Sequence, residues 1–253
     1  MYKNLMFAVS VILVLGLYGT ASATDGAILQ CDVGLSEEIS AMMGRPYNLK
    51  EGWTLLTKGD TYKSDVLNEA YHGPSTAVTY TNLAGTGIDL TIDTSGGQHL
   101  EGRDRYSEFP ACGPLGIDYY KADDTGPGEG DMILSFYNLA AGDYALKTYH
   151  NNPAFEGGVV LIDRIAVYGA VSASTTAYDV PMTGSLNDDE IGTGLVNFTA
   201  TGDAGLSVTV ILHGSQEAGY TGDPQLNGFE LIPEPATVVL LGLGGLALLR
   251  RKR

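Results

Sequence analysis

The sequence predicts an all-β protein whose main domain is an antiparallel β-sandwich of jelly-roll type. In much of its central region apolar residues alternate with polar ones, as in residues 88–93, where Ile88, Leu90 and Ile92 share one face. This is the two-residue period of a half-buried strand. Gly, Asn and Asp separate the short runs, as is typical of turns between strands. Several strands in antiparallel succession favour a β-sandwich, and a jelly roll among the sandwiches.

The N-terminus has the three parts of a secretory signal peptide. Lys3 is the positive region, residues 5–18 are the apolar region, and Ala21-Ser22-Ala23 is a small-residue cleavage site. We therefore expect cleavage after Ala23, with an uncleaved N-terminal helix as the alternative. This division leaves residues 24–232 as the exported domain.

The exported domain is long enough to bury a core of its own. The full chain carries a formal net charge of −16, and removal of the basic ends makes the exported form still more acidic. So acidic a surface repels nucleic acid and anionic lipid. We expect no nucleic-acid partner.

The predicted elements follow in order along this domain. One short helix is expected at residues 36–43, where Ser36 is a good N-cap and Gly44 ends the run. Trp53 is the only tryptophan, and it is predicted to lie in the core, with sugar stacking as the alternative. Strands are predicted at residues 27–33, 53–57, 77–81, 87–93, 132–139, 144–150, 159–167, 195–200, 206–213 and 226–232.

Two pairs of these strands are predicted to lie side by side. Residues 132–139 and 144–150 are joined by Ala140-Ala141-Gly142-Asp143, a composition typical of hairpin turns. Residues 195–200 and 206–213 are the second candidate pair, and in the latter Leu206, Val208, Val210 and Leu212 are predicted to share one face.

Residues 95–130 are poor in apolar alternation and rich in charge and glycine. The chain has two cysteines, Cys31 and Cys112, and an exported pair without competitors most simply forms one disulfide. Closing so long a loop would stabilise the fold by about 4–5 kcal/mol on the entropic model. Two buried thiols and metal ligation are the alternatives.

The C-terminus consists of a rigid turn, an apolar helix and a basic cluster. Pro233-Glu234-Pro235 precedes an apolar run over residues 236–249, which is followed by Arg250, Arg251, Lys252 and Arg253. The run corresponds to about 21 Å of helix, which is short for a hydrocarbon core of about 30 Å. The basic end would stay in the cytoplasm. A transient transmembrane helix is therefore expected, with an ordinary anchor as the alternative.

This tail resembles the PEP-CTERM sorting signal of Gram-negative bacteria. The resemblance implies recognition of Pro233, Glu234 and Pro235 by an exosortase-type enzyme, with residues 233–253 as the sorting segment. It also implies transit through the inner membrane to the cell surface or extracellular matrix.

A second resemblance concerns the exported domain. Residues 102–105, 136–144, 148–151 and 226–231 are similar to galactose-binding-like or malectin-like jelly rolls of exported bacterial proteins. The resemblance implies two packed antiparallel sheets and often carbohydrate recognition. The sequence departs from it in having no evident sugar-binding aromatic cluster and no complete set of calcium ligands.

No residue pattern predicts catalysis. A G-x-S-x-G motif is absent, and the four histidines are far apart without H-E-x-x-H spacing. We therefore expect no catalytic residue and no cofactor.

Calcium is the one metal for which the sequence offers ligands. Asp123, Asp124, Glu129 and Asp131, separated by glycines, are the best candidates, with a solvated acidic loop as the alternative. The run Asp188-Asp189-Glu190 is a second, weaker cluster.

A glycan site, if present, is expected where loops meet. Tyr149, His150 and Asn151 end a predicted strand, and Arg103 and Arg105 are added as polar partners. The alternative use of the two arginines is an ion-pair network around Asp104. Exposed aromatic rings near Tyr149 would favour sugar binding, and buried ones a structural role.

The first hypothesis is therefore a non-enzymatic exported β-sandwich of the cell surface or exopolysaccharide matrix, with weak glycan binding as its expected ligand activity. A purely structural or adhesive matrix component is the second. A secreted carbohydrate-active enzyme is the third.

Overall fold

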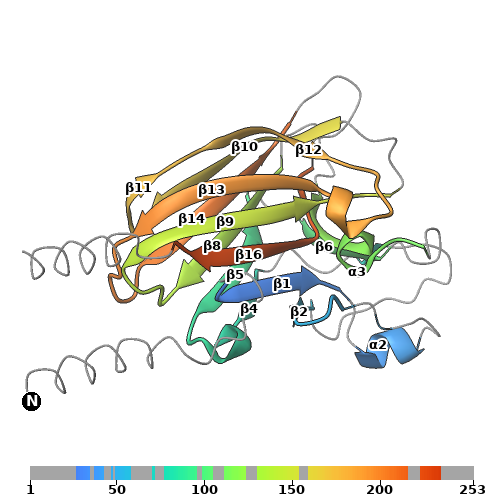
Figure 1. Cartoon of the computed structure of the whole chain (residues 1–253), viewed down its shortest axis with the longest axis horizontal. Coiled ribbons are helices and arrows are strands. Elements are labelled where there is room, and N and C mark those ends of the chain that lie inside the picture. Colours follow the sequence, from blue (N-terminus) through green and yellow to red (C-terminus); the bar gives the residue numbers. More distant parts are fainter. Residues whose placement is uncertain are drawn as a thin grey trace, which may run out of the picture.

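The computed structural model arranges the chain as two six-stranded sheets packed face to face, with a four-stranded third sheet beside them (Figure 1). The residues that it describes are 27–34, 37–42, 47, 49–57, 70–71, 77–95, 99–104, 111–123, 130–153, 159–215 and 223–234. The predicted signal peptide and the apolar segment 236–249 lie outside these residues. Every strand pairing in the three sheets is antiparallel except one, β1 with β2.

We call the first sheet the front sheet, because it faces the viewer in Figure 1. Its strands, in spatial order, are β11 (Val171–Ser174), β13 (Gly192–Ala200), β9 (Gly142–His150), β16 (Gly228–Pro233), β1 (Leu29–Val33) and β2 (Thr54–Leu56). The last strand in the chain is therefore a central strand, between β9 and β1.

The back sheet lies behind it. Its strands, in spatial order, are β12 (Ala177–Met182), β10 (Val159–Gly169), β14 (Ser207–Gly214), β8 (Asp131–Tyr137), β5 (Asp89–Thr94) and β4 (Val78–Tyr80).

The third sheet comes mainly from residues 95–130, for which the sequence predicts no strand. Its order is β15 (Gln225–Leu226), β7 (Asp118–Asp123), β6 (His99–Asp104) and β3 (Ala70–Tyr71). The buried Tyr120 of β7 lies 2.6 Å, hydroxyl to hydroxyl, from Tyr80 of β4, which joins this sheet to the back sheet. Strands β6 and β7 escaped prediction because their sequences are dense in charge and glycine.

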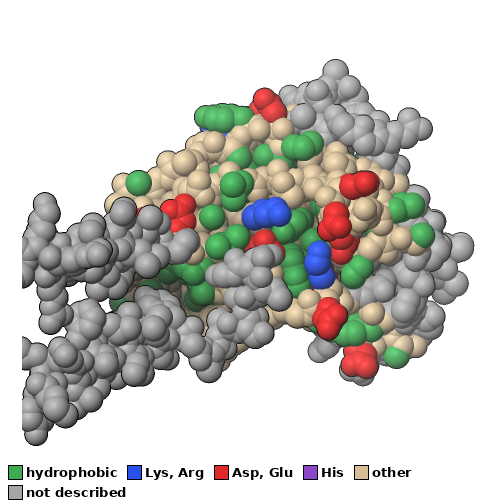
Figure 2. Space-filling view, viewed as in Figure 1, with side chains coloured by type: hydrophobic (Ala, Val, Ile, Leu, Met, Phe, Trp, Pro, Cys, Tyr) green, Lys and Arg blue, Asp and Glu red, His purple; other side chains and the backbone are tan. Residues whose placement is uncertain are grey.

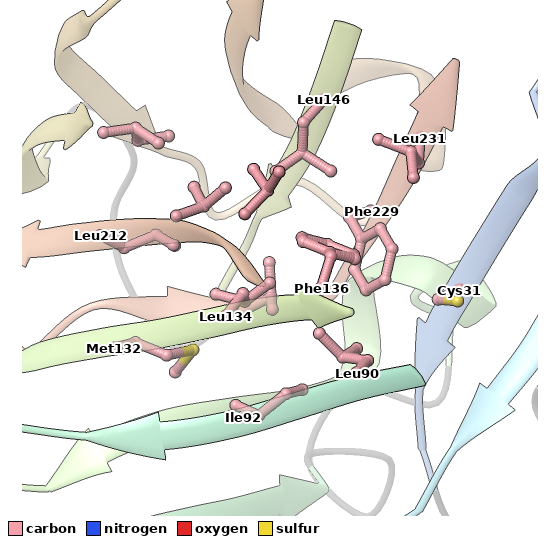
Figure 3. Close-up of a cluster of buried hydrophobic side chains, with 14 of the residues drawn as sticks. Cys31, Leu90, Ile92, Met132, Leu134, Phe136, Leu146, Leu212, Phe229 and Leu231 are labelled. Atoms are coloured by element: carbon pink, nitrogen blue, oxygen red, sulfur yellow. The ribbon is translucent and has the colours of Figure 1, made fainter. Parts of the chain in front are cut away.

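The core lies between the front and back sheets and follows the alternation of the strands. In β8, Met132, Leu134 and Phe136 are buried and their neighbours are half-exposed. Phe136 meets Phe229 of β16 edge to face, with ring centroids 5.5 Å apart (Figure 3). This aromatic pair joins the two sheets.

The predicted hairpin of residues 132–150 is wrong. Strand β8 pairs with β14 and β5 in the back sheet, whereas β9 pairs with β13 and β16 in the front sheet. Residues 138–141 therefore cross between the sheets, and Asn138 adopts a left-handed backbone with φ 62°. Each strand has one apolar face, and that face points into the core whether the two strands lie side by side in one sheet or in the two facing sheets, so alternation does not distinguish the two arrangements.

The second predicted pair is wrong for the same reason. Strand β13 lies in the front sheet and β14 in the back sheet. Val208, Val210 and Leu212 do share the buried face of β14, but Leu206 precedes the strand and is exposed.

The remaining local predictions agree closely with the structure. The predicted helix appears as α2 (Glu37–Met42). The strand expected at residues 226–232 is interrupted at Asn227, which separates β15 from β16. The all-β class and the sandwich are thus confirmed, while the jelly-roll topology stays a prediction.

Candidate functional site

The residues predicted to bind a glycan lie at the C-terminal end of β9 and are buried. Tyr149, His150 and Asn151 are 8%, 1% and 0% exposed. The sequence predicted these side chains at a strand end where loops meet and a glycan could bind, and their burial corrects that prediction. After β9 the chain runs beside the loop that follows β12, and an isolated β-bridge between Asn151 and Thr183 joins these two segments.

Both ring nitrogens of His150 have partners inside the protein. Nδ1 lies 2.5 Å from the Gln225 carbonyl oxygen, and Nε2 lies 2.7 Å from the Thr148 hydroxyl. Since a carbonyl only accepts, Nδ1 carries the proton, and the Thr148 hydroxyl donates to Nε2. Burial lowers the pKa of His150 from 6.5 to about 4, although the bond to Gln225 opposes this shift.

We expect His150 to stay neutral, with its proton on Nδ1, from pH 7 down to about 5. Nitrogen-15 NMR of the imidazole checks this, and the urea-unfolded chain, which should titrate near pH 6.5, is the control. Because the folded pKa is lowered, the contribution of His150 to stability is complete above pH 6.5. This contribution, about 3 kcal/mol of the free energy of unfolding, is lost as the pH falls from 6.5 towards 4. Titration of the folded imidazole near pH 6.5 would contradict the buried position.

Asn151 connects three parts of the chain. Its backbone N–H donates to the Asn227 side-chain oxygen at 2.6 Å, and its side-chain amide donates to the Ser185 carbonyl at 2.9 Å. Its side-chain oxygen accepts bonds from the Thr183 hydroxyl and the Ser185 N–H, each at 3.0 Å. Both the nitrogen and the oxygen of the Asn151 side chain are therefore engaged in hydrogen bonds within the fold, as is usual for a buried polar group.

Tyr149 points to the outer face of the front sheet, where it packs on Trp53. The two rings meet edge to face at 5.5 Å, with Leu115 and Ile191 in the same buried cluster. Gly228 makes room for this packing, since a Cβ there would lie 2.5 Å from the Cys31 carbonyl oxygen and 3.3 Å from the Trp53 ring. Trp53 is buried, as the sequence predicted.

Two lysines extend over these rings. Lys147 Nζ lies 4.8 Å from the centre of the Tyr149 ring, and Lys50 Nζ lies 5.2 Å from the centre of the Trp53 ring. On this face basic side chains lie among apolar ones, with acidic side chains close by (Figure 2). The rings are thus covered by cations, and neither offers an open face to a sugar.

Sequence reasoning missed a buried carboxyl group beside this cluster. Asp32 of β1 accepts the Lys50 backbone N–H at 2.9 Å, and its other oxygen has no hydrogen-bond partner among the residues that the structure describes. Lys50 Nζ lies 3.4 Å from Asp188 of the 3-10 turn η2 (Asp188–Glu190). Burial raises the pKa of Asp32 to about 8; the charge of Asp188 adds to this, and Lys50 opposes it. No motif could have found Asp32, because only its position in the sheet makes it unusual.

The two predicted arginines are not placed with these residues. Arg103 lies in β6 of the third sheet, where its backbone pairs with Ala70 and Tyr119. Its side chain, and the whole of Arg105, lie outside the described residues.

The predicted calcium ligands are described only in part. Asp123 ends β7, Asp131 begins β8, and Asp124 and Glu129 lie outside the described residues. Asp131 lies 3.0 Å from Nδ1 of His213. Within the described ranges no three acidic, histidine or cysteine side chains gather as a metal site, so calcium binding stays a prediction.

Cys31 and Cys112 are both buried thiols that are not bonded to each other. Cys31 points into the core beside Phe229 (Figure 3). The sulfur of Cys112 instead lies 3.7 Å from the Ser185 carbonyl oxygen and 3.9 Å from the Asn151 amide. The structure therefore does not contain the predicted disulfide. Burial also raises the pKa of Cys31 far above its usual range, which disfavours the reactive thiolate.

Comparison with known proteins identifies one segment of the chain. Residues 231–253 match the family model described as the PEP-CTERM protein-sorting motif. Neither the curated proteins nor the solved structures contain a match. Among the residues that the structure describes, no helix is long and apolar enough to cross a membrane.

Proposed function

We propose that this protein is a non-enzymatic structural component of the cell surface or exopolysaccharide matrix, delivered there by an exosortase-type system. The observation that carries the proposal is the sorting motif at residues 231–253. It supports processing by an exosortase-type enzyme and export to the cell surface. The finer assignment, to a structural role in the matrix, is our inference.

The burial of the predicted ligand residues supports a structural role. Tyr149 and Trp53 pack on each other, and His150 and Asn151 use their polar atoms within the fold. The acidic composition of the chain, with a formal net charge of −16 over its full length, also suits a hydrated matrix, because like charges keep the protein soluble.

Glycan binding is the second candidate, favoured by two exposed tyrosines elsewhere. Tyr168 of β10 and Tyr178 of β12 are 46% and 67% exposed. Both lie on the outer face of the back sheet, since Tyr168 pairs with Thr209 and Tyr178 pairs with Arg164. Arg164 is the cross-strand neighbour of Tyr178, and exposed tyrosine rings are suited to weak stacking on sugar rings.

The sorting assignment is tested with alanine at Pro233, Glu234 and Pro235 together in a bacterium that carries an exosortase-type enzyme. We expect the variant to remain as a full-length precursor in the inner membrane, as membrane fractionation and the mass of the product would show. Glu51→Ala, which changes an exposed acid in a turn of the domain, is the control. Release of the triple variant at the normal rate would contradict the assignment.

The choice between the two candidates is tested with a glycan array on residues 24–232, with and without calcium. A structural component gives no binding in either condition. Binding that Tyr178→Ala abolishes and Tyr149→Phe leaves intact would establish the glycan candidate on the back sheet.

A further inference from the structure

The sorting motif begins inside the folded domain. The matched residues start at Leu231, which is fully buried in the core, and β16 continues to Pro233. Pro233 is in register with Tyr144 of β9, and the Glu234 N–H donates to the Asp143 carbonyl at 2.9 Å. The first four residues of the motif are therefore part of the front sheet or hydrogen-bonded to it.

No spacer separates the domain from the Pro-Glu-Pro sequence, because β16 itself ends at Pro233. Two residues of extended chain span about 7 Å at most, so Pro233 lies within that distance of the buried Leu231. Glu234 also lines a small open pocket at this end of the front sheet, the rim of the sandwich, with Asp143, Thr175, Asn197 and Thr199. An enzyme that bound the motif while residues 231–234 remained in the sheet would have to fit against this rim.

The end of β16 is held from one side. Pairing with β1 ends where Leu29 meets Leu231, and the described residues provide only β9 as a partner for Ile232 and Pro233. Pro233 has no N–H to donate, and the bond from the Glu234 N–H to the Asp143 carbonyl is the last one that the described residues show between this end of the chain and β9. Such a strand end opens locally at a small cost compared with global unfolding.

We propose that residues 232–234 detach from β9 before the exosortase-type enzyme binds the motif, so that the folded domain limits the rate of its own processing. This inference rests on the sorting function proposed above. Extended peptides are commonly recognised through the hydrogen-bonding groups of their backbone, and β9 occupies one edge of that backbone here. When opening is fast relative to cleavage, the rate follows the population of the open form.

The first test lengthens the connection in the full-length protein. Gly-Ser-Gly-Ser is inserted between Ile232 and Pro233, and the conversion of precursor to product is followed by pulse–chase in the bacterium that carries the enzyme. We expect conversion about fivefold faster or more, the factor that corresponds to one hydrogen bond of ordinary strength. The matched control is the same insertion between Gly202 and Asp203, in the exposed turn between β13 and β14, which should leave the rate unchanged.

The second test closes the strand end. Ile232 and Ala145 are cross-strand neighbours, so Ile232→Cys with Ala145→Cys should form a disulfide across the pair. We expect processing at least tenfold slower than in Ile232→Cys alone, and restored by a reductant.

The outcomes separate the two proposals. If the spacer leaves the rate unchanged or lowers it, and the disulfide does not slow conversion, the enzyme reads the motif on the folded rim and detachment is wrong. If replacement of Pro233, Glu234 and Pro235 by alanine leaves processing intact, the sorting function itself is wrong.

Discussion

Phe229→Ala should lower the free energy of unfolding of the exported domain by about 3–5 kcal/mol. Phe229 is fully buried on β16, and its ring meets Phe136 of β8 across the interface of the two sheets. Truncation removes the aromatic pair and leaves a cavity between strands whose backbones are held by hydrogen bonds on both sides, so the site has little room to collapse. Urea unfolding of residues 24–234, followed by circular dichroism, measures the change.

Leu195→Ala is the matched control, because Leu195 lies in the same sheet, on β13, and is 54% exposed. We expect it to change the free energy of unfolding by less than about 0.5 kcal/mol. Equal effects of the two substitutions would show that the core does not lie between the sheets as described.

Asp32→Asn should raise the stability of the domain at neutral and alkaline pH. Burial raises the pKa of Asp32 from 3.8 to about 8. Between these two pH values Asp32 is therefore protonated in the folded state and ionised in the unfolded state. The contribution of Asp32 therefore becomes less favourable as the pH rises from about 4 to about 8. At pH 7 this effect lowers the free energy of unfolding by about 4 kcal/mol. Asparagine keeps an acceptor for the Lys50 N–H and carries no charge.

The measurement is urea unfolding of both proteins at several pH values. The difference between them isolates Asp32, since His150 contributes equally to each. It should be small at pH 4 and grow to a few kcal/mol by pH 8. Asp163→Asn, the same chemical change at an exposed position of β10, is expected to alter stability by less than about 0.5 kcal/mol. A constant difference across the pH range would mean that Asp32 is solvated.

Local patterns predicted most individual strands but not their partners. The alternation in residues 132–139 and 206–213 correctly identified β8 and β14, because burial of one face imposes a two-residue period. The same alternation does not say which strand lies alongside. The short links after β8 and β13 cross between the sheets although their composition is that of hairpin turns.

The candidate site shows the same limit. Tyr149, His150 and Asn151 resemble a polar strand end in sequence. The loop after β12 and strand β15 make His150 and Asn151 interior, and packing on Trp53 buries Tyr149. Asp32 occupies an ordinary polar position in the alternating sequence of β1. Its burial comes from residues that lie far away in the chain, such as Lys50 and Asp188. Burial of a polar group is a property of its surroundings, which composition and spacing do not record.

The sequence by itself determined the all-β class and the sorting motif, because a strand period and a linear recognition signal are both contained in short runs of residues. Tertiary structure alone decided that β16 is a central strand and that the motif begins within it. The partners of that strand, β9 and β1, come from segments about 80 and 200 residues earlier in the chain. Hydrogen bonds over such separations depend on how the whole sandwich folds, and they hold the first residues of a signal that the sequence alone shows only as a C-terminal segment.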